Sequence, residues 1–300
     1  MDRGDLNPRP PDCKSHKTPT VSYNLPLDWS KFKVWLKNRF SSSYARDVYS
    51  YARRYYAVLL HDEVSELLSL NGDKRRMVMS SLSNLSKFLG LYKEWKRIVE
   101  DYGLKWSQNN AEDYVISRMA NSRVQGDITC WIQQVKLKLP RLCYFMDFAL
   151  CSGLRFSESI NSYNLMVELA NKGELKKYYN MEAEVLEHFR FKQFFIRKTK
   201  KAFITFMPKR FVLEAAKQAK LSKWQIENCI KRAGFKLRFG DIREYWATFM
   251  TKWLTQPEID FLQGRVSSTV FMRNYFNPAL IDDLKQRVFM GVSELLRKTS

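Results

Sequence analysis

The chain has 300 residues, 45% of them hydrophobic and 27% charged, which is enough to form two domains of ordinary size or one large one. Its 51 Lys and Arg against 31 Asp and Glu give a net charge of +20, which indicates a polyanionic partner, with nucleic acid ahead of an anionic membrane surface. The sequence shows no apolar run long enough to span a bilayer and no signal-peptide core at its start.

The cysteines and histidines argue against several kinds of site. The five cysteines are odd in number, irregularly spaced and without a CxxC pair, so neither a disulfide framework nor a zinc site is indicated. With only three histidines, a His-rich metal site is not expected either. We therefore expect a protein of the reducing cytoplasm that uses no metal or other cofactor.

The first part of the chain predicts a tail followed by a helical domain. Residues 1–25 are polar and Pro-rich, which predicts disorder. Over residues 26–108, apolar side chains such as Trp29, Phe32 and Leu36 recur at helical spacing, and no strand-like alternation appears before residue 110. Any single cation here fits an ordinary solvated face, but the summed excess favours contacts with DNA phosphates. The candidate DNA-binding residues are Lys31, Lys33, Lys37, Arg39, Arg53 and Arg54.

A second domain is expected over residues 109–300, after a polar linker that follows Gly103. Pro140 begins a helix whose middle is apolar nearly all round, and Gly153 is placed to end it, so this helix should be central and buried. Residues 185–208 hold two Phe- and Ile-rich runs around the basic turn KTKK, which predicts a β-hairpin. The predicted fold is therefore mainly α with a small antiparallel β-sheet (α+β).

The rest of the chain predicts helices. They are expected over 209–220 and 222–234, then from an N-cap at Asp241 whose capping box Glu244 completes, and over the short stretch EIDFLQG. A last helix over 279–297 carries an apolar stripe that fits either its own domain or a neighbouring protomer.

Three arginines occur in unusual settings. Arg155 lies in SGLRFSES, Arg243 in GDIREYWATFM, and Arg265 follows Gly264 in LQGRVSSTVFMRNYF, which places Tyr275 eleven residues after the glycine. Arginine forks donate paired hydrogen bonds to phosphate oxygens and stay charged at any working pH. Converging arginines would stabilise the charge that develops when a DNA phosphodiester is cleaved.

These residues resemble the three conserved boxes of the tyrosine recombinases, or phage integrases. SGLRFSES resembles the first box, GDIREYWATF the second with Arg243, Ala247 and Thr248, and GRVSSTVFMRNY the third with Thr269 at the expected spacing. KTKK stands where the family has its catalytic lysine, and LQGR in place of Leu-Gly-His is most like integrases of archaeal viruses and plasmids. The resemblance covers roughly residues 125–290 and implies a tyrosine recombinase catalytic domain preceded by a helical core-binding domain.

The resemblance implies a function and a role for each residue. The expected activity is DNA integration or excision of a mobile element through a 3′-phosphotyrosyl intermediate, without metal or ATP, by a homo-tetramer on double-stranded DNA in the host cytoplasm. Tyr275 would be the nucleophile, with Arg155, Arg243 and Arg265 as phosphate ligands. Lys200, or alternatively Lys198, would be the general acid that protonates the departing 5′ oxygen.

One position departs from the family pattern and keeps alternatives open. Three residues before Arg243, where the family has His or Lys, stands Gly240, so no general base is present there. Lys236, Arg238, water or the substrate phosphate remain as proton acceptors. The alternative functions are a type IB topoisomerase-like nicking-closing enzyme, which uses the same residues, and a DNA-binding module that has lost catalysis.

Overall fold

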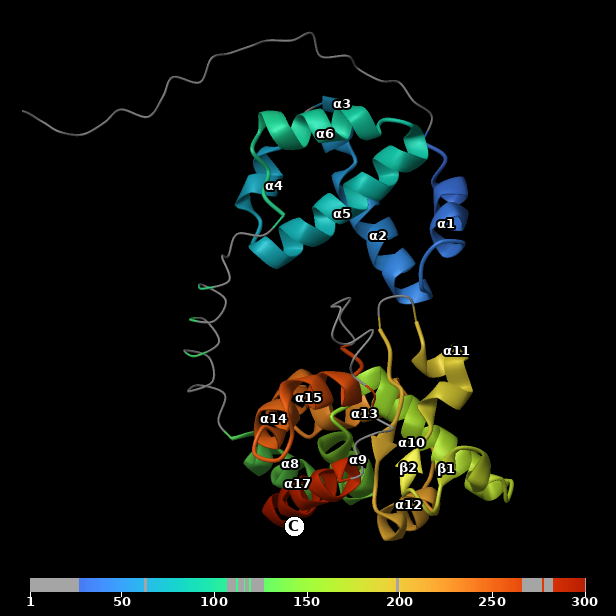
Figure 1. Cartoon of the computed structure of the whole chain (residues 1–300). Coiled ribbons are helices and arrows are strands. Elements are labelled where there is room, and N and C mark those ends of the chain that lie inside the picture. The colour runs from blue at the N-terminus through green and yellow to red at the C-terminus, as the bar shows by residue number, and fades with distance from the viewer. Residues whose placement is uncertain are drawn as a thin grey trace, which may run out of the picture. The chain divides into compact units, whose positions relative to one another are not determined.

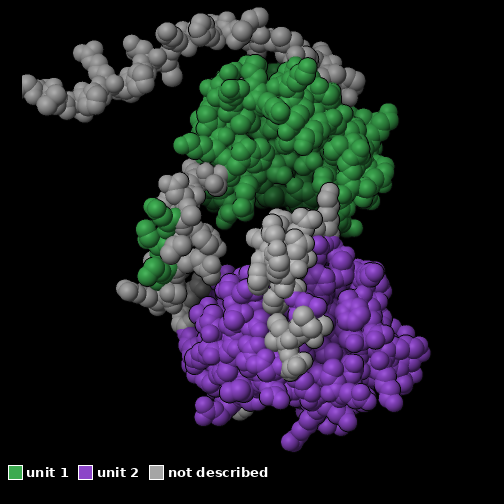
Figure 2. Space-filling model, in the orientation of Figure 1, with its two compact units in different colours: residues 1–121 green, residues 122–300 purple. Residues whose placement is uncertain are grey.

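The computed structural model describes residues 27–61, 64–106, 127–197, 200–265 and 283–299, with four single positions between or after these ranges. The chain divides into two compact units, residues 1–121 and residues 122–300 (Figure 2). Each has a hydrophobic core of its own. The linker expected after Gly103 and the tail expected over residues 1–25 fall largely or wholly outside the described residues.

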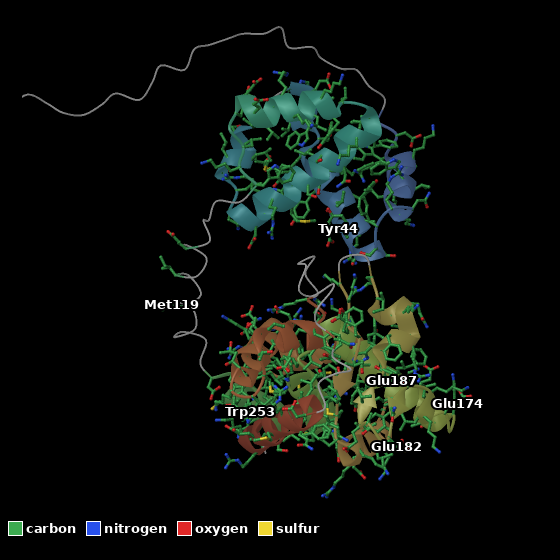
Figure 3. The ribbon with its side chains drawn as sticks, in the orientation of Figure 1. Tyr44, Met119, Glu174, Glu182, Glu187 and Trp253 are labelled. Carbon is green, nitrogen blue, oxygen red and sulfur yellow. The ribbon has the colours of Figure 1, made fainter. Side chains whose placement is uncertain are left out.

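Unit 1 is helical throughout its described residues (Figure 1). Its helices are α1 (Trp29–Lys37), α2 (Ser42–Tyr55), α3 (Ala57–His61), α4 (Ser65–Ser69), α5 (Gly72–Leu89) and α6 (Tyr92–Asp101). α2 packs along α5, where the hydroxyls of Tyr44 (labelled in Figure 3) and Ser80 are 2.8 Å apart. The buried guanidinium of Arg75 donates to the carbonyl oxygens of Leu67, Leu68 and Leu70, which satisfies the C-terminal end of α4.

Unit 2 is mainly helical and contains one small sheet. Its longer helices are α8 (Ile128–Lys138), α9 (Cys143–Ser152), α10 (Phe156–Asn171), α12 (Lys209–Ala216), α13 (Lys223–Arg232), α14 (Phe239–Met250), α15 (Gln256–Leu262) and α17 (Leu284–Thr299). The short elements are η1 (Pro140–Leu142), η2 (Leu175–Lys177), η3 (His188–Phe191), α11 (Lys192–Phe195), and the strands β1 (Tyr179–Asn180), β2 (Val185–Leu186) and β3 (Thr205–Phe206). The predicted fold class is confirmed.

The sheet is antiparallel in the order β1-β2-β3, with Leu186 paired to Tyr179 on one side and to Thr205 on the other. α9 is the central helix of unit 2, with α8, α10, α14 and α17 packed around it (Figure 1). Nearly all its side chains are apolar and seven of its residues are buried, so its amphipathicity is weak and its position central. As predicted, Gly153 ends it in the left-handed conformation, with φ 59°.

The β-hairpin predicted over residues 185–208 is wrong in its first arm. Residues 188–195, which carry most of the first Phe-rich run, form η3 and α11 instead of a strand. His188, which we expected in a strand, lies buried in η3, with its ring nitrogens 2.7 Å from the Tyr178 hydroxyl and 2.8 Å from Thr205 Oγ1. Burying this ring with both nitrogens hydrogen-bonded outweighs the strand propensity of the phenylalanines. Antiparallel pairing remains at the base of the hairpin, where Leu186 pairs with Thr205, and next to the turn, where Ile196 bridges Lys201.

The start predicted for the helix that carries Arg243 is also wrong. Asp241 is not the N-cap, because α14 begins two residues earlier, at Phe239. The ring of Phe239 stacks on that of Phe156, with centroids 3.8 Å apart and planes 9° apart, and this buried contact draws the first turn back. Asp241 lies inside that turn and forms an ion pair with Arg238 at 2.7 Å.

The apolar stripe of the last helix packs on its own unit. Leu284, Val288, Val292 and Leu295 of α17 are buried against the core of unit 2. Polar contacts hold both ends of the helix. Near its start Arg287 donates to Glu258 at 2.6 Å and to the carbonyl of Trp253 (labelled in Figure 3), and at its end Lys136 donates to the carbonyl of Thr299 at 2.8 Å. Residues 279–282, the predicted start of this helix, lie outside the described residues.

Candidate active site

Two glycines permit the close packing on which the site is built. A Cβ on Gly153 would lie 2.4 Å from the Trp246 indole, whose Nε1 donates to the carbonyl of Cys151 at 2.9 Å. A Cβ on Gly264 (φ 64°) would lie 1.5 Å from the carbonyl oxygen of Lys201. Only glycine fits either position, because each needs a left-handed backbone as well as a bare Cα. The two glycines thus allow α9 to pack closely on α14, and the end of α15 to pack closely on Lys201, the last residue of KTKK.

Arg155 stands at the N-cap of α10, where a buried carboxylate holds it. Its Nη1 donates to both oxygens of Glu158, at 3.1 and 3.2 Å, and to the carbonyl of Lys201 at 3.4 Å. The same carboxylate accepts the backbone N–H of Arg155 at 3.2 Å, which satisfies one of the free donors at the helix start. The side chain is 24% exposed and its Nε and Nη2 have no partner among the described residues, so these donors are open to an incoming anion.

Arg243, in α14, is 8% exposed and is held by the other two boxes. Its Nη1 donates to the carbonyl of Gly153 at 2.8 Å, and its Nη2 donates to the carbonyl of Gln263 at 2.7 Å. Burial, then the nearby positive charges of Arg155 and Arg265, lower the pKa of Arg243 to about 9. The guanidinium still carries its charge at neutral pH, and an anion that bound beside it would relieve the repulsion.

The third box begins at the C-terminal end of α15. The N–H of Gly264 donates to the carbonyl of Phe261 and that of Arg265 to the carbonyl of Asp260, a pair of bonds that forms a Schellman cap. Gln263 is fully buried, and its Nε2 donates to the carbonyl of Arg243 at 2.9 Å and of Gly153 at 3.4 Å. Arg265, at the end of this cap, is exposed to solvent. One glutamine therefore ties all three boxes together.

The lysine turn lies between Arg197 and Lys201 and carries Lys200. The N–H of Arg197 donates to the carbonyl of Lys200 at 2.8 Å and closes the turn, and Lys200 is exposed. The carbonyl of Lys201, just beyond it, lies between Arg155 and Gly264. The structure thus brings Lys200 next to the residues that contact two of the arginine boxes.

The other predicted site residues fall in three groups. Tyr275, Lys198 and Thr269 lie outside the described residues. Gly240 is exposed in the first turn of α14, with open space where a Cβ would stand. The cations predicted to contact DNA are all exposed and all lie in unit 1: Lys31, Lys33, Lys37, Arg39, Arg53 and Arg54.

The sequence analysis missed two residues that take part in this arrangement. One is Gln263, which directly precedes the pair Gly264 and Arg265. The other is Arg197, whose Nη2 donates to Glu158 Oε1 at 3.2 Å, so that two guanidiniums share one buried carboxylate. A further arginine three residues before the candidate Lys200 was the signal that could have pointed to it.

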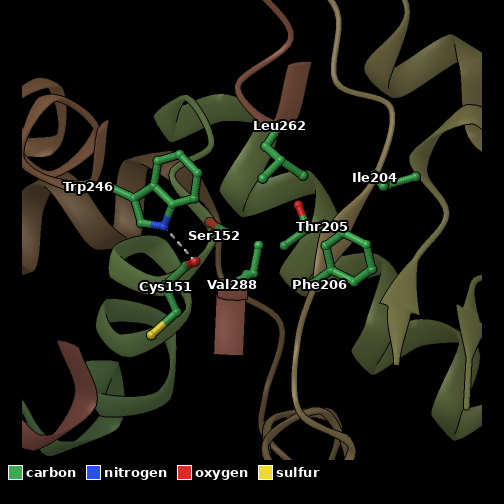
Figure 4. Close-up of a pocket in the computed structure, with 8 residues that line it drawn as sticks. All are labelled: Cys151, Ser152, Ile204, Thr205, Phe206, Trp246, Leu262 and Val288. Atoms are coloured by element: carbon green, nitrogen blue, oxygen red, sulfur yellow. Dashed lines mark hydrogen bonds between the residues drawn. The ribbon is translucent and has the colours of Figure 1, made fainter. Parts of the chain in front are cut away.

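The surroundings of the site offer little other chemistry. The small cavity behind it is lined mostly by apolar side chains such as Ile204, Leu262 and Val288, and its polar members include Thr205 and Ser152 (Figure 4). No cluster of His, Cys, Asp or Glu that could hold a metal ion occurs in the described part of the chain. None of the described helices combines the length and apolarity needed to cross a bilayer.

Comparison with known proteins agrees with the geometry. No curated protein and no solved structure matches the chain. Residues 127–288, more than half of the chain, match the archaeal phage integrase family, and this range contains all three arginine boxes and the lysine turn. The chain belongs to the archaeal phage integrase family.

Proposed function

We propose that the protein is a site-specific tyrosine recombinase, which cleaves and rejoins double-stranded DNA through a 3′-phosphotyrosyl intermediate to integrate or excise a mobile element. Family membership supports integrase activity in general. The observation that carries the finer proposal is the setting of Arg243, whose guanidinium is buried, charged and fixed by carbonyls of the first and third boxes. A cation held in this way, with no carboxylate hydrogen-bonded to it among the described residues, is preorganised for a phosphate.

The proposed step transfers one bond at phosphorus. The Tyr275 oxygen attacks, a P–O bond forms to it, and the bond from phosphorus to the 5′ oxygen breaks. Lys200 gives its proton to that oxygen, and the rejoining step is the reverse. Arg155, Arg243 and Arg265 neutralise the added charge on the phosphate oxygens at the transition state. Because the bond energy is kept in the phosphotyrosine, neither ATP nor a metal ion is required.

The phenolic proton of Tyr275 needs an acceptor other than residue 240. A charged arginine accepts no proton, and Arg238 is in any case ion-paired with Asp241 at 2.7 Å. Lys236 is exposed and would first have to lose its own proton. We therefore assign the proton to water or to a phosphate oxygen, with the arginines lowering the energy of the phenolate.

The rest of the chain supplies the DNA contacts in this proposal. Exposed Lys and Arg of α1 and α2 in unit 1 would contact the phosphate backbone and act through their number. Recombination requires two duplexes, so we propose that four copies of the chain assemble on DNA. Since the apolar stripe of α17 is buried within its own unit, the assembly would use other surfaces.

A nicked suicide substrate tests the proposal, because it traps the covalent intermediate by losing the 5′ end that would reverse the step. We expect the wild-type protein to form a covalent adduct on its cognate site and Tyr275→Phe to form none. If the wild type forms no adduct, the protein is not an active recombinase. If Tyr275→Phe still forms one, another residue is the nucleophile.

A second assay separates recombination from topoisomerase action, which would use the same residues. Incubation of two labelled duplexes that each carry the site should give exchanged products. A protein that relaxes supercoiled DNA but exchanges no strands would instead be a nicking-closing enzyme.

A further inference from the structure

We propose that Arg197 is a positioning residue that anchors the lysine turn on the buried Glu158 and thereby holds Lys200 beside the phosphate that Arg155 binds. This inference rests on the proposed function, since it assigns a task within the same reaction. Arg197 would act through Lys200 and would not contact the reacting atoms.

The first observation is the shared carboxylate. Glu158 is fully buried, and a buried carboxylate is unfavourable unless its hydrogen bonds are satisfied. It accepts from the backbone N–H and Nη1 of Arg155 and from Nη2 of Arg197. Arg197 reaches it across 39 residues of sequence, and so joins the lysine turn to the N-terminus of α10.

The second observation is that the turn is held at two points on opposite arms. On the arm after the turn, the carbonyl of Lys201 accepts from Arg155 and packs against Gly264. On the arm before it, the hydrogen bond from Ala202 N–H to the carbonyl of Phe195 and the pair from Arg197 to Glu158 fix the base. Without the Arg197 side chain, the turn would keep its backbone hydrogen bonds and the contact of Lys201 with Arg155, and would lose its anchor on Glu158.

The third observation is the local charge. Glu158 pairs with Arg155 and Arg197, while Arg243 interacts electrostatically with Arg155, Arg265, Glu158 and Asp260, so two carboxylates stand among four guanidiniums and cannot neutralise them all. Arg197 pairs with this carboxylate as Arg155 does, but its side chain is 45% exposed, against 24% for Arg155. It would therefore serve the geometry of the turn more than the charge of the phosphate.

The chemical consequence is specific to the leaving group. A general acid must lie within hydrogen-bond reach of the oxygen it protonates, and a misplacement of about 1 Å can cost on the order of 100-fold in rate. An arginine that positions the acid therefore matters only when the leaving group needs a proton. A 5′-bridging sulfur leaves as a thiolate, for which the thiol pKa is about 8.5, and needs none.

The test compares single-turnover cleavage of ordinary DNA and of DNA with sulfur at the 5′ bridging position, with enzyme in excess so that binding is saturated. We expect Arg197→Gln to slow ordinary cleavage by roughly 10- to 100-fold, and the loss to disappear largely on the sulfur substrate. Arg197→Lys should recover most of the rate, because a single donor reaches Glu158 and lysine can supply one. Arg243→Gln should remain slow on both substrates, because its defect lies at the phosphate.

A matched control comes from the same segment. Arg190, in η3, is also exposed and also paired with a glutamate, but that glutamate is Glu187 (labelled in Figure 3) and not Glu158. The Arg190→Gln variant loses the same charge, and we expect it to cleave both substrates at the wild-type rate.

Two results would overturn the inference: an Arg197→Gln variant that cleaves ordinary DNA at the wild-type rate, or one whose loss is equal on both substrates. Absence of any adduct with the wild type would instead overturn the proposed function, and this inference with it. Amide exchange of the free protein gives a readout that needs no DNA. We expect Arg197→Gln to speed exchange at Arg197 and Ala202, and unchanged exchange there would also contradict the proposal.

Discussion

The cations of unit 1 and the arginines of unit 2 are held in opposite ways. In unit 1, Lys31 and Arg54 are largely exposed, and each has one exposed acidic partner, at 3.2 and 3.7 Å. In unit 2, Arg243 is 8% exposed and is fixed by two backbone carbonyls, while Arg155 is held by a carboxylate that is fully buried. The cations of unit 1 supply positive charge at an exposed surface, whereas the arginines of unit 2 supply positive charge at a fixed position.

The difference predicts two kinds of response to mutation. Exposed charges interact with a polyanion through a screened field, so each one contributes little and salt weakens them all. Preorganised donors act where charge develops during the reaction, and one of them can control the rate. Changes in unit 2 should therefore alter the chemistry, and changes in unit 1 should alter affinity and its salt dependence.

The largest effect is expected for Arg243→Lys. Lysine keeps the positive charge but can no longer donate to the carbonyls of Gly153 and Gln263 and to a phosphate in one plane. We expect cleavage to fall by roughly 10²- to 10³-fold, as for loss of one preorganised donor. Single-turnover cleavage measures the loss, and DNA binding with thermal unfolding provides the controls. A rate within a few-fold of wild type would show that fixed geometry is not what this residue supplies.

The next effect is expected for Gly264→Ala, because a Cβ there would lie 1.5 Å from the carbonyl oxygen of Lys201. Gly173→Ala is the matched control, since Gly173 also has positive φ (70°) but no atom within 4 Å of the Cβ position. Both variants bear the strain of a left-handed residue. Gly264→Ala should lose a further 1–3 kcal/mol or so of unfolding free energy, the usual range for overpacking, and should also slow cleavage. Equal losses of unfolding free energy in the two variants would mean that the lysine turn moves away from the added methyl group at no cost.

A third prediction contrasts the two units in acid. Burial lowers the pKa of His188 in unit 2 to about 3, whereas the described histidine of unit 1, His61, is exposed. The folded state keeps His188 neutral, while the unfolded state takes up a proton below about pH 6.5. The contribution of the neutral His188 to the free energy of unfolding is therefore complete above pH 6.5. It is lost as the pH falls towards 3, and the loss is on the order of 2 kcal/mol by pH 5.

Unfolding followed by amide exchange at pH 7 and pH 5 checks this, because it reports each unit separately. Unit 2 should lose more stability than unit 1, and His188→Gln should remove most of the difference, although this variant starts from a lower stability. If unit 1 weakens as much as unit 2 over this interval, the buried histidine is not the cause.

Sequence patterns predicted the parts of the site that depend on local structure. Gly153 ends α9 because a left-handed cap needs glycine, and that requirement is visible in the sequence. The parts that depend on distant contacts were missed. Phe239 extends α14 because it stacks on Phe156, Arg197 finds its partner 39 residues away, and Gln263 bonds to Gly153 across 110 residues. Periodicity carries no information about such pairs.

The smallest effects are expected in unit 1. Each phosphate contact that is lost should lower the slope of log K against log salt by about 0.9. If Lys31, Lys33 and Lys37 of α1 all contact phosphates, changing the three to glutamine should lower the slope by about 2.7 and should weaken binding more at low salt than at high salt. Cleavage under saturating conditions should stay at the wild-type rate.

The control for this triple variant removes the same charge from unit 2. Lys172, Lys177 and Lys217 are exposed and each is paired with a glutamate on its own stretch of chain, so their replacement by glutamine changes the net charge equally. If only the overall field of the protein matters, the two triple variants will shift the salt slope by the same amount. If α1 lies against the DNA backbone, only the unit 1 variant will shift it, and the two classes of cation then differ in place as well as in burial.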